Sequence, residues 1–565
     1  MATTKQEYDA VRINFLDSSD ARGTSASYDA RFLNGFFDPV YNKVKQDIEY
    51  FFTKRPGTGA GMIPSPTGGS AAIGRGIFAP SSAFSTPLFS VFGNKLYRGT
   101  QPLSTFQVTT LATSTGRVAF AETRPGATTH YVGVNDGTSL YLIDTSYGVT
   151  VLNNVAIATS SVANPSVITT STAHNLQTGN KVYITGHTGS TPDINGSVAG
   201  TYTVTVINST SFSIPVNVTV GGTGGTLGVF PATNTGDLEY MDGYWVVAKS
   251  DGTIWNCDVD NPLVWDPTKY ITAQMYGSSL VGLARNNNYL FALGTNSYQA
   301  FYDGNNANGS FLTNAESAVQ QIGCLSNDTV AHEENSIYWV GISPIGGYTV
   351  WNLDGTANLT DIGTPALNRM FLTENWSSGA SFGFTLRVAG KFFYVLSLYT
   401  SQRTFVYDPD IKIWVEWAST TGTTYPICSV SYDLKNHYLI GQDQSNGYLY
   451  DLTDNSGAAL INDNGGAFQF LARTKRFDSG NMKRKFCTSL DLIGDTQSST
   501  TNVNVQYSDD DYVTTSTART LDMSVTRPFA KAWGNFRRRS WQVSYTGANP
   551  CRLVGIEIVY STGDS

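Results

Sequence analysis

Residues 289–302, YLFALGTNSYQAFY, carry the pattern that decides the fold. A short strand of aromatic and aliphatic residues is followed by the polar turn Gly294-Thr295-Asn296 and by a second strand that ends in Tyr302. Gly and Asn tolerate the positive φ angles that tight hairpins require. The stretch therefore predicts a β-hairpin.

The same hairpin pattern returns along the chain, at 89–97, 131–143, 244–255, 289–302, 337–351, 392–407 and 438–450. Short runs that would supply an inner strand precede most copies, at 116–121, 281–284, 329–332, 382–386 and 427–432. After a long interruption behind the second copy, the copies recur at about 35 to 60 residues, a spacing typical of propeller blades. We predict an all-β fold with a six-bladed β-propeller, in which the first hairpin closes the ring against the last. Seven blades also fit, and a string of separate β-sandwiches is the alternative.

Changes in pattern divide the chain into five expected segments. These are an extended N-terminal segment (1–60), a first part of the propeller (61–152), an inserted small β domain (153–230), a second part of the propeller (231–455) and a C-terminal antiparallel β domain (456–565). The insertion is nearly free of charge and alternates strictly at 201–206. Helix is expected only at 315–322.

The composition favours a rigid all-β particle component over an ordinary cytoplasmic enzyme. Charged residues make up 14% of the chain, against roughly 25% in an average globular protein, while aromatic residues reach 12%. The formal net charge is −8. Sequence-specific nucleic-acid binding needs a basic footprint, so the acidic balance fits a surface past which DNA slides.

The cysteines and the hydropathy place further limits on the function. The five cysteines are widely spaced and form no CxxC pair, so neither a zinc site nor a disulfide framework is expected: Cys257, Cys324, Cys428, Cys487 and Cys551. The N-terminus lacks the apolar core of a signal peptide, and no stretch approaches the roughly 20 apolar residues of a membrane span. We expect a protein that is soluble when made.

A search for catalytic patterns finds none that is convincing. The five histidines lack metal-ligand spacing, and 69–76 resembles a phosphate loop without its lysine. The turn 250–255 is similar to the turns of sialidase-like propellers, but it stands alone, and no glycosidase-like pair of carboxylates is evident. We therefore predict no catalytic residue, no cofactor, no metal and no enzymatic activity.

The C-terminal segment concentrates positive charge. Its basic residues are Arg473, Lys475, Arg476, Lys483, Arg484, Lys485 and the run Arg537-Arg538-Arg539, with Trp541 beside it. Arg and aromatic residues are enriched in interface cores, so Arg537, Arg538, Arg539 and Trp541 are candidates for docking a neighbouring subunit. The alternatives are contact with DNA and a solvated face.

Two N-terminal stretches resemble a known family. Residues 30–37 contain Arg31 and Asn34, and residues 50–57 end in Lys54-Arg55-Pro56-Gly57. An Arg-x-x-Asn element followed by Lys-Arg-Pro-Gly before the propeller is similar to the opening of the packaged-DNA stabilization proteins, the tail nozzle proteins of podoviruses. Turns at 406–409 and 447–451 and the strand–turn 506–510 are also similar to that family. The insertion, through 174–182 and 194–196, looks like a small β module found in phage virion proteins, and we expect it to face outward and meet a tail fibre or a host surface.

The resemblance implies a structural virion protein of a short-tailed bacteriophage. A ring of six copies (a homo-oligomeric hexamer) would form the tail nozzle below the portal and adaptor proteins, beside the tail fibres. It would close the DNA exit channel, retain the packaged genome and conduct double-stranded DNA during ejection, without sequence-specific binding. The expected location is the tail of the virion, after assembly in the host cytoplasm. The alternatives are a tail-fibre or receptor-binding protein, a glycan-acting propeller enzyme and a bacterial propeller scaffold.

Overall fold

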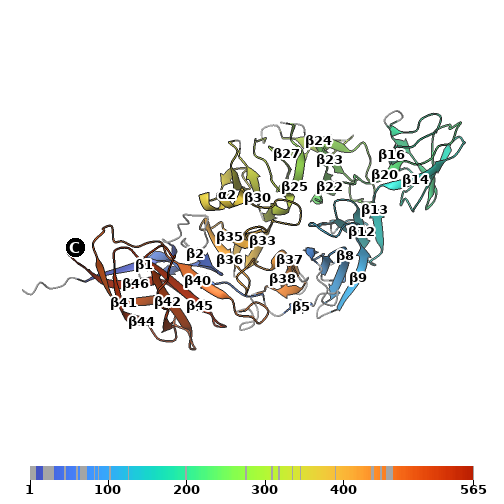
Figure 1. Cartoon of the computed structure of the whole chain (residues 1–565). Coiled ribbons are helices and arrows are strands. Elements are labelled where there is room, and N and C mark those ends of the chain that lie inside the picture. The colour runs from blue at the N-terminus through green and yellow to red at the C-terminus, as the bar shows by residue number, and fades with distance from the viewer. Residues whose placement is uncertain are drawn as a thin grey trace, which may run out of the picture.

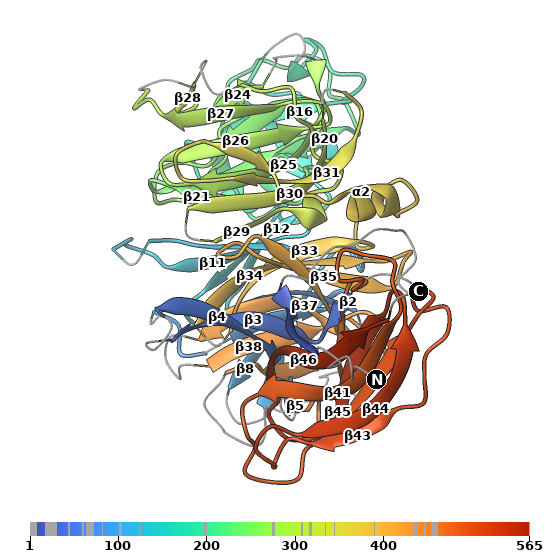
Figure 2. The same cartoon turned by 90° about the vertical axis from the view of Figure 1, so that its left-hand side faces the viewer.

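The computed structural model describes most of the chain in one all-β arrangement. The described residues are 8–16, 31–42, 46–58, 61–63, 73–81, 83–86, 88–100, 104–124, 126–196, 200–273, 277–306, 309–315, 319–333, 335–343, 345–388, 390–433, 438–445, 448–453 and 462–563. The C-terminal strands and the strands of residues 155–228 lie at opposite ends of a central propeller (Figure 1). A second view brings the C-terminal strands to the front (Figure 2).

Seven four-stranded antiparallel meanders make up the propeller. The first two comprise β6 (Gly74–Phe78), β7 (Leu88–Phe92), β8 (Lys95–Thr100) and β9 (Ser104–Thr110), then β10 (Ala119–Glu122), β11 (Tyr131–Asn135), β12 (Leu140–Asp144) and β13 (Val149–Leu152). The third and fourth comprise β21 (Glu239–Met241), β22 (Tyr244–Ala248), β23 (Thr253–Asn256) and β24 (Tyr270–Thr272), then β25 (Leu280–Asn286), β26 (Tyr289–Gly294), β27 (Tyr298–Asp303) and β28 (Leu312–Asn314). The fifth and sixth comprise β29 (Ala331–Glu333), β30 (Ser336–Ile342), β31 (Tyr348–Leu353) and β32 (Leu359–Asp361), then β33 (Phe382–Val388), β34 (Lys391–Leu398), β35 (Arg403–Asp408) and β36 (Ile413–Trp417). The seventh comprises β37 (Ile427–Asp433), β38 (Tyr438–Asp443), β39 (Leu449–Asp451) and β5 (Gly61–Ile63).

The seven predicted hairpins become the two middle strands of the seven meanders. The all-β propeller is confirmed, and the described residues form seven such units, one more than the six that we favoured. Contacts between inner strands run in order through β10, β21, β25, β29, β33, β37 and β6. The ring is completed between β6 and β10, where Val118 N donates to Arg75 O over 3.1 Å.

Apolar cores between neighbouring blades hold the ring together. Between the fourth and fifth blades, Tyr298 packs edge-on against Trp339 with ring centroids 6.0 Å apart. Between the seventh and first blades, Ile440 and Leu449 pack in one cluster with Leu88. Each blade buries its faces on its neighbours, as blades that have no core of their own must.

A seven-stranded sheet interrupts the propeller between its second and third blades. Its strands are β14 (Val155–Ser160), β15 (Ser166–Thr170), β16 (Lys181–Thr185), β17 (Tyr202–Thr203), β18 (Thr205–Asn208), β19 (Ser211–Ile214) and β20 (Thr226–Gly228). One apolar cluster runs from Ile157 and Leu227 in this sheet to Trp245 and Trp265 in the third blade. The insertion therefore shares a core with the blade beside it.

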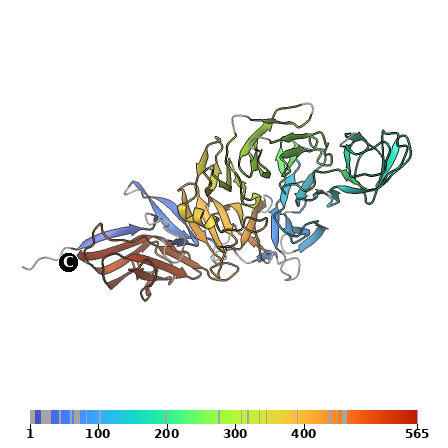
Figure 3. The same cartoon turned by 45° about the horizontal axis from the view of Figure 1, so that its top comes forward.

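The N-terminal strands are part of the C-terminal sheets. These strands are β1 (Asp9–Asn14), β2 (Arg31–Leu33), β3 (Gly35–Asn42) and β4 (Asp47–Lys54). The C-terminal strands are β40 (Gln469–Arg473), β41 (Lys485–Gly494), β42 (Asn502–Ser508), β43 (Arg519–Asp522), β44 (Phe529–Phe536), β45 (Ser540–Thr546) and β46 (Arg552–Thr562). One sheet contains β1, β3 and β4 with β46, β41 and β44, and β2 joins β36 of the sixth blade to β40. Figure 3 shows the blue N-terminal strands between the propeller and the red C-terminal strands.

Two short helical segments lie wholly within the described residues. These are α2 (Pro365–Phe371) and the 3₁₀ turn η4 (Asn327–Thr329). Thr364 caps α2 by accepting a hydrogen bond from Leu367 N, and Pro365 occupies the first turn. The helix expected at 315–322 is absent from its described part, and residues 316–318 lie outside the described residues.

Candidate functional site

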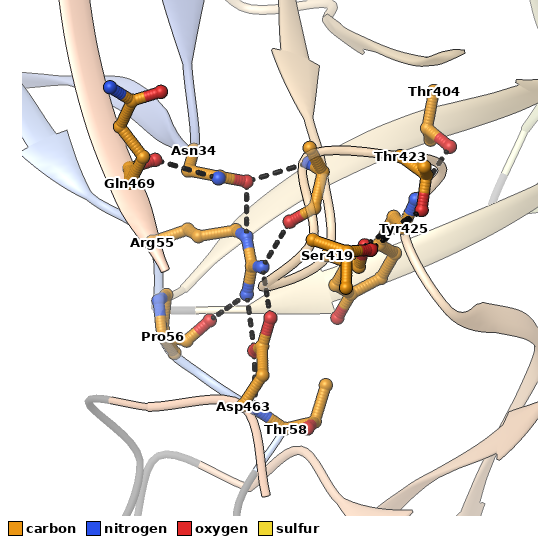
Figure 4. A network of polar contacts seen from close by, with 12 residues as sticks. Asn34, Arg55, Pro56, Thr58, Thr404, Ser419, Thr423, Tyr425, Asp463 and Gln469 are labelled. Carbon is orange, nitrogen blue, oxygen red and sulfur yellow. Dashed lines mark hydrogen bonds and ion pairs between the residues drawn. The ribbon is translucent and has the colours of Figure 1, made fainter. Parts of the chain in front are cut away.

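Asn34, Arg55 and Pro56 of the N-terminal motif meet at one buried junction between the propeller and the C-terminal strands (Figure 4). The Arg55 side chain is fully buried, and it forms a bidentate ion pair with Asp463 at 2.9 and 2.6 Å. It also donates to Ala418 O over 2.9 Å and to Asn34 Oδ1 over 2.9 Å. Its guanidinium lies 3.9 Å from the ring centre of Phe468. A buried charge with this many partners is well satisfied, so Arg55 fixes three chain segments at once.

Asn34 forms the second half of the junction. Its side chain accepts a hydrogen bond from Ala418 N over 2.7 Å and donates to Gln469 O over 2.8 Å. Its φ of 57° lies in the left-handed region that Asn tolerates better than most residues. A short polar side chain with both a donor and an acceptor is therefore required where β2 turns into β3.

The other motif residues surround this pair. Arg31 donates to Glu416 Oε2 over 2.8 Å, and Arg403 pairs with the same carboxylate. Lys54 Nζ donates to Gly547 O over 2.6 Å, and burial lowers the pKa of Lys54 to about 8. A Cβ on Gly57 would lie 2.1 Å from Asn462 O, so only glycine fits there.

The junction is a structural site rather than a reactive one. The backbone that follows Arg55 also contributes hydrogen bonds to the junction. Pro56 O accepts one from the Arg55 guanidinium over 2.9 Å, and Thr58 N donates one to Asp463 Oδ1 over 3.2 Å. The motif thereby joins the N-terminal segment, the sixth blade and the C-terminal strands into one unit. The sequence pointed to Arg55 and Asn34 through the family motif, but nothing marked Asp463, which is 408 residues away along the chain.

The C-terminal basic run divides into an exposed part and a buried part. Arg537 and Arg538 are exposed, whereas Arg539 is 1% and Trp541 0% exposed. The Arg539 guanidinium forms a bidentate ion pair with Asp509 at 2.7 and 2.8 Å and lies 3.6 Å from the ring centre of Tyr507. Arg539 and Trp541 are buried, and Arg539 is bonded within the C-terminal strands, so neither side chain is presented on the surface of the chain. Docking through Arg537 and Arg538 stays a prediction.

The propeller encloses a central cavity of about 1100 Å³. Asp237 lies on its wall, accepts from Leu283 N over 2.7 Å and from Asn327 Nδ2 over 2.5 Å, and so links the third, fourth and fifth blades. Burial raises the pKa of Asp237 and that of Glu239 to about 7 each. Both side chains keep some solvent contact through the cavity, although they lie deep in the ring. The pKa of His332 on the same wall is also lowered, because the ring around the cavity desolvates it, although its side chain is exposed to the cavity.

The remaining patterns of catalytic interest have structural roles. Arg75, in the stretch that resembles a phosphate loop, is buried and donates to five carbonyl or hydroxyl groups of residues 93–116, while 69–72 lie outside the described residues. All five cysteines are free and buried, and burial raises the pKa of each thiol, to about 12 for Cys257. Within the described parts of the chain, no three His, Cys, Asp or Glu side chains gather as a metal site would require. Among these residues, no helix has the length and apolar character needed to cross a membrane.

The fold and the junction together define a class of protein: a β-propeller with additional β-sheets, whose N-terminal motif joins the propeller to the C-terminal strands. A family model described as "Bacteriophage P22 Gp10, beta-propeller" matches residues 52–457, which is well over half of the chain. The chain belongs to this phage stabilisation family and is a phage structural protein. The family predicted from the two N-terminal stretches is thereby confirmed.

Comparison with solved structures finds other propellers at low similarity. A streptogramin B lyase has 9% identity and a TM-score of 0.35, over 74% of this chain and 97% of its own. A virginiamycin B lyase from Staphylococcus aureus with quinupristin has 8% identity and a TM-score of 0.37, over 69% and 97%. The WD40 β-propeller domain of Doa1 has 10% identity and a TM-score of 0.28, over 69% and 95%. TM-scores below 0.5 carry no argument about function, and no curated protein matches the chain at a significant level.

Proposed function

We propose that this chain is the subunit of the tail nozzle of a short-tailed bacteriophage. Six copies form a ring that closes the DNA exit channel, retains the packaged genome and conducts DNA during ejection. Portal and adaptor proteins lie above the ring and tail fibres beside it, in a virion assembled in the host cytoplasm. The chain acts as a conduit and not as an enzyme.

The observation that carries this proposal is the family match together with the position of the family motif. Arg31, Asn34 and Lys54-Arg55-Pro56-Gly57 all lie in the junction that joins the propeller to the C-terminal strands. A wall that holds DNA under pressure must transmit force between its parts without opening. A buried, fully bonded ion pair at the joint suits that demand, since removing either partner is costly.

The net charge of −8 also suits a conduit. An acidic lumen repels the phosphate backbone, so DNA slides past without being held. Homo-oligomeric rings close through heterologous contacts, in which each subunit presents a different patch to each neighbour. The exposed Arg537 and Arg538 are proposed as part of one such patch.

The test is immunogold labelling of intact particles with antibody against this chain, alongside antibody pre-absorbed with the purified chain. Gold at the tip of a short tail supports the nozzle. Gold on lateral fibres contradicts it and favours host recognition, and absence of gold from every particle contradicts a virion role. Particles assembled without the chain should also release their DNA to added nuclease, whereas retention of the genome would contradict the stabilising role.

A further inference from the structure

A groove of about 1000 Å³ lies between the inserted sheet and the third blade. Asn154, Tyr183, Thr185 and Thr226 line it from the insertion side, while Trp255 and Tyr270 line it from the blade. Figure 1 shows β16 and β20 of the insertion next to β22, β23 and β24 of this blade. The groove is independent of the junction and of the central cavity described above.

Two aromatic rings form one wall of the groove. Trp255 on β23 and Tyr270 on β24 are cross-strand partners, and their rings are stacked with centroids 5.1 Å apart and planes 24° apart. Tyr270 is 45% exposed, and Trp255 is half-buried. The indole nitrogen of Trp255 is already satisfied, because it donates to Thr253 Oγ1 over 2.9 Å. The two rings therefore present a continuous aromatic surface to the groove, and the indole N–H of Trp255 already has its hydrogen-bond partner.

Hydroxyl and amide groups form the other walls. Outside the aromatic wall, the hydroxyl and amide side chains of the lining that make no hydrogen bond to another described residue are Asn154, Tyr183, Thr185, Thr201, Thr226 and Thr272. Each can both donate and accept. They surround the aromatic wall with uncharged hydrogen-bonding groups, and such a lining favours a ligand rich in hydroxyls.

The charges of the groove cancel. Lys249 and Asp251 are the charged residues of its lining, and they form an ion pair at 3.3 Å. A nucleic acid would need an excess of positive charge, and an acidic polymer would likewise find no unpaired cation here. A purely apolar ligand would leave the hydroxyl-bearing walls desolvated without partners.

The groove is also held rigid from below. Phe230 and Trp265 are buried beneath it and pack edge-to-face with centroids 5.1 Å apart. Lys181 of the insertion pairs with Asp266 of the blade at 3.1 Å. The shared apolar core and this ion pair fix the two walls relative to each other, so a ligand meets a preformed site.

We infer that this groove binds a neutral oligosaccharide. Sugar rings have apolar C–H faces that stack on aromatic rings and hydroxyls that bond to Thr, Asn and Tyr, and the groove offers both. Its volume is at the upper end of the roughly 300–1,000 Å³ of small-molecule sites, so it accommodates more than one sugar ring. The inference does not rest on the nozzle assignment, because a carbohydrate site on the insertion is compatible with any position in the virion.

The test is binding of the full chain to an array of bacterial surface oligosaccharides that includes neutral and acidic members. Retained glycans are then titrated by calorimetry against the chain and its variants. Tyr270→Ala removes an exposed ring and should weaken binding about tenfold. Thr226→Trp fills the groove from the insertion side and should abolish binding.

Tyr289→Ala is the matched control, since Tyr289 is an equally exposed tyrosine, at 45%, on the fourth blade and outside the groove. It should bind as the unchanged chain does. Each variant is first shown to have the melting temperature of the unchanged chain. The inference is overturned if the array retains no glycan, if it retains only acidic glycans, or if Tyr270→Ala and Thr226→Trp both bind normally.

Discussion

At the scale of single residues, a few buried polar groups hold together segments that are distant along the chain. Arg55 and Asp463 are separated by 408 positions, and Lys391 reaches the carbonyl of Phe37 across 354 positions. Breaking such a pair leaves a buried charge without compensation, which typically costs about 3–5 kcal/mol. These groups therefore specify how the parts of the molecule join.

Arg55→Met should strongly destabilise the junction, because Asp463 loses its ion-pair partner while it remains buried. We expect an unfolding free energy lower by about 3–5 kcal/mol, measured as a shift of the urea midpoint. The double variant Arg55→Met/Asp463→Asn should recover part of this loss, since no uncompensated charge remains. A single variant as stable as the unchanged chain would contradict the structural role of the pair.

The cavity carboxyls make a prediction about pH. Burial raises the pKa of Glu239 to about 7, although the Arg285 guanidinium opposes this shift. Between about pH 4 and pH 7 the unfolded chain releases a proton that the folded chain keeps, so this group makes stability fall as pH rises through that window.

Glu239→Gln should remove this fall in the unfolding free energy between about pH 4 and pH 7. At pH 8 the variant should be more stable than the unchanged chain, by on the order of 1 kcal/mol, and at pH 4 the two should be equal. Thermal melting across this pH range measures the difference. Asp410→Asn, at an exposed position, is the control, and a difference that is independent of pH would refute the prediction.

At the scale of strands and sheets, β2 is the element on which the architecture depends. Only three residues long, it pairs parallel with β36 at Leu33 and antiparallel with β40 over its full length. It thereby extends the sixth blade into a nine-stranded sheet that ends at β43. Phe32 secures it from one side, with ring centroids 5.1 Å from both Phe37 and Phe52.

Phe32→Ala should loosen this strand. Truncation of a buried phenylalanine typically costs about 3–5 kcal/mol, through lost burial and the cavity that remains. Limited proteolysis should then cut between the propeller and the C-terminal strands faster than in the unchanged chain. Tyr41→Ala, at a position 59% exposed on β3, should change the cleavage rate little, and equal rates for both variants would argue against β2 as the link.

Repeated elements could be predicted from the sequence, whereas long-range pairings could not. Each hairpin is specified locally by strand residues and a turn, so all seven were recognisable, including the one at 289–302. The number of blades could not be predicted in this way, because the fourth strand of the seventh blade is β5, which precedes the first blade in the sequence and pairs with β39. In the same way, the burial of Arg539 depends on Asp509 and Tyr507, which no spacing rule connects to it.

At the scale of the whole molecule, the parts form a row with the propeller in the middle, the insertion at one end and the C-terminal strands at the other (Figures 1 and 3). Shared cores join both neighbours to the propeller. A row of this kind offers separate surfaces for neighbouring subunits and for other partners. The division into domains at the expected boundaries remains a prediction.

Arg537→Glu/Arg538→Glu should reduce assembly of the ring without unfolding the chain, since both side chains are exposed. Arg539→Glu should instead destabilise the C-terminal strands, because it places a carboxylate against Asp509. Analytical ultracentrifugation measures assembly, and thermal melting measures stability. Normal rings from the double variant would remove Arg537 and Arg538 from the interface.

The pairing of β1 with β46 has a consequence for how the protein is made. Asp9 lies opposite Tyr560, and Arg12 opposite Glu557, so β1 can pair with β46 only after nearly all of the chain between them has been translated. Until then β1 lacks its partner strand, whereas β3 and β4 can already pair with each other and the blades can form. Contacts between residues this far apart in sequence slow folding. A chain that ends before β46 would therefore leave the edge of β1 without its partner strand.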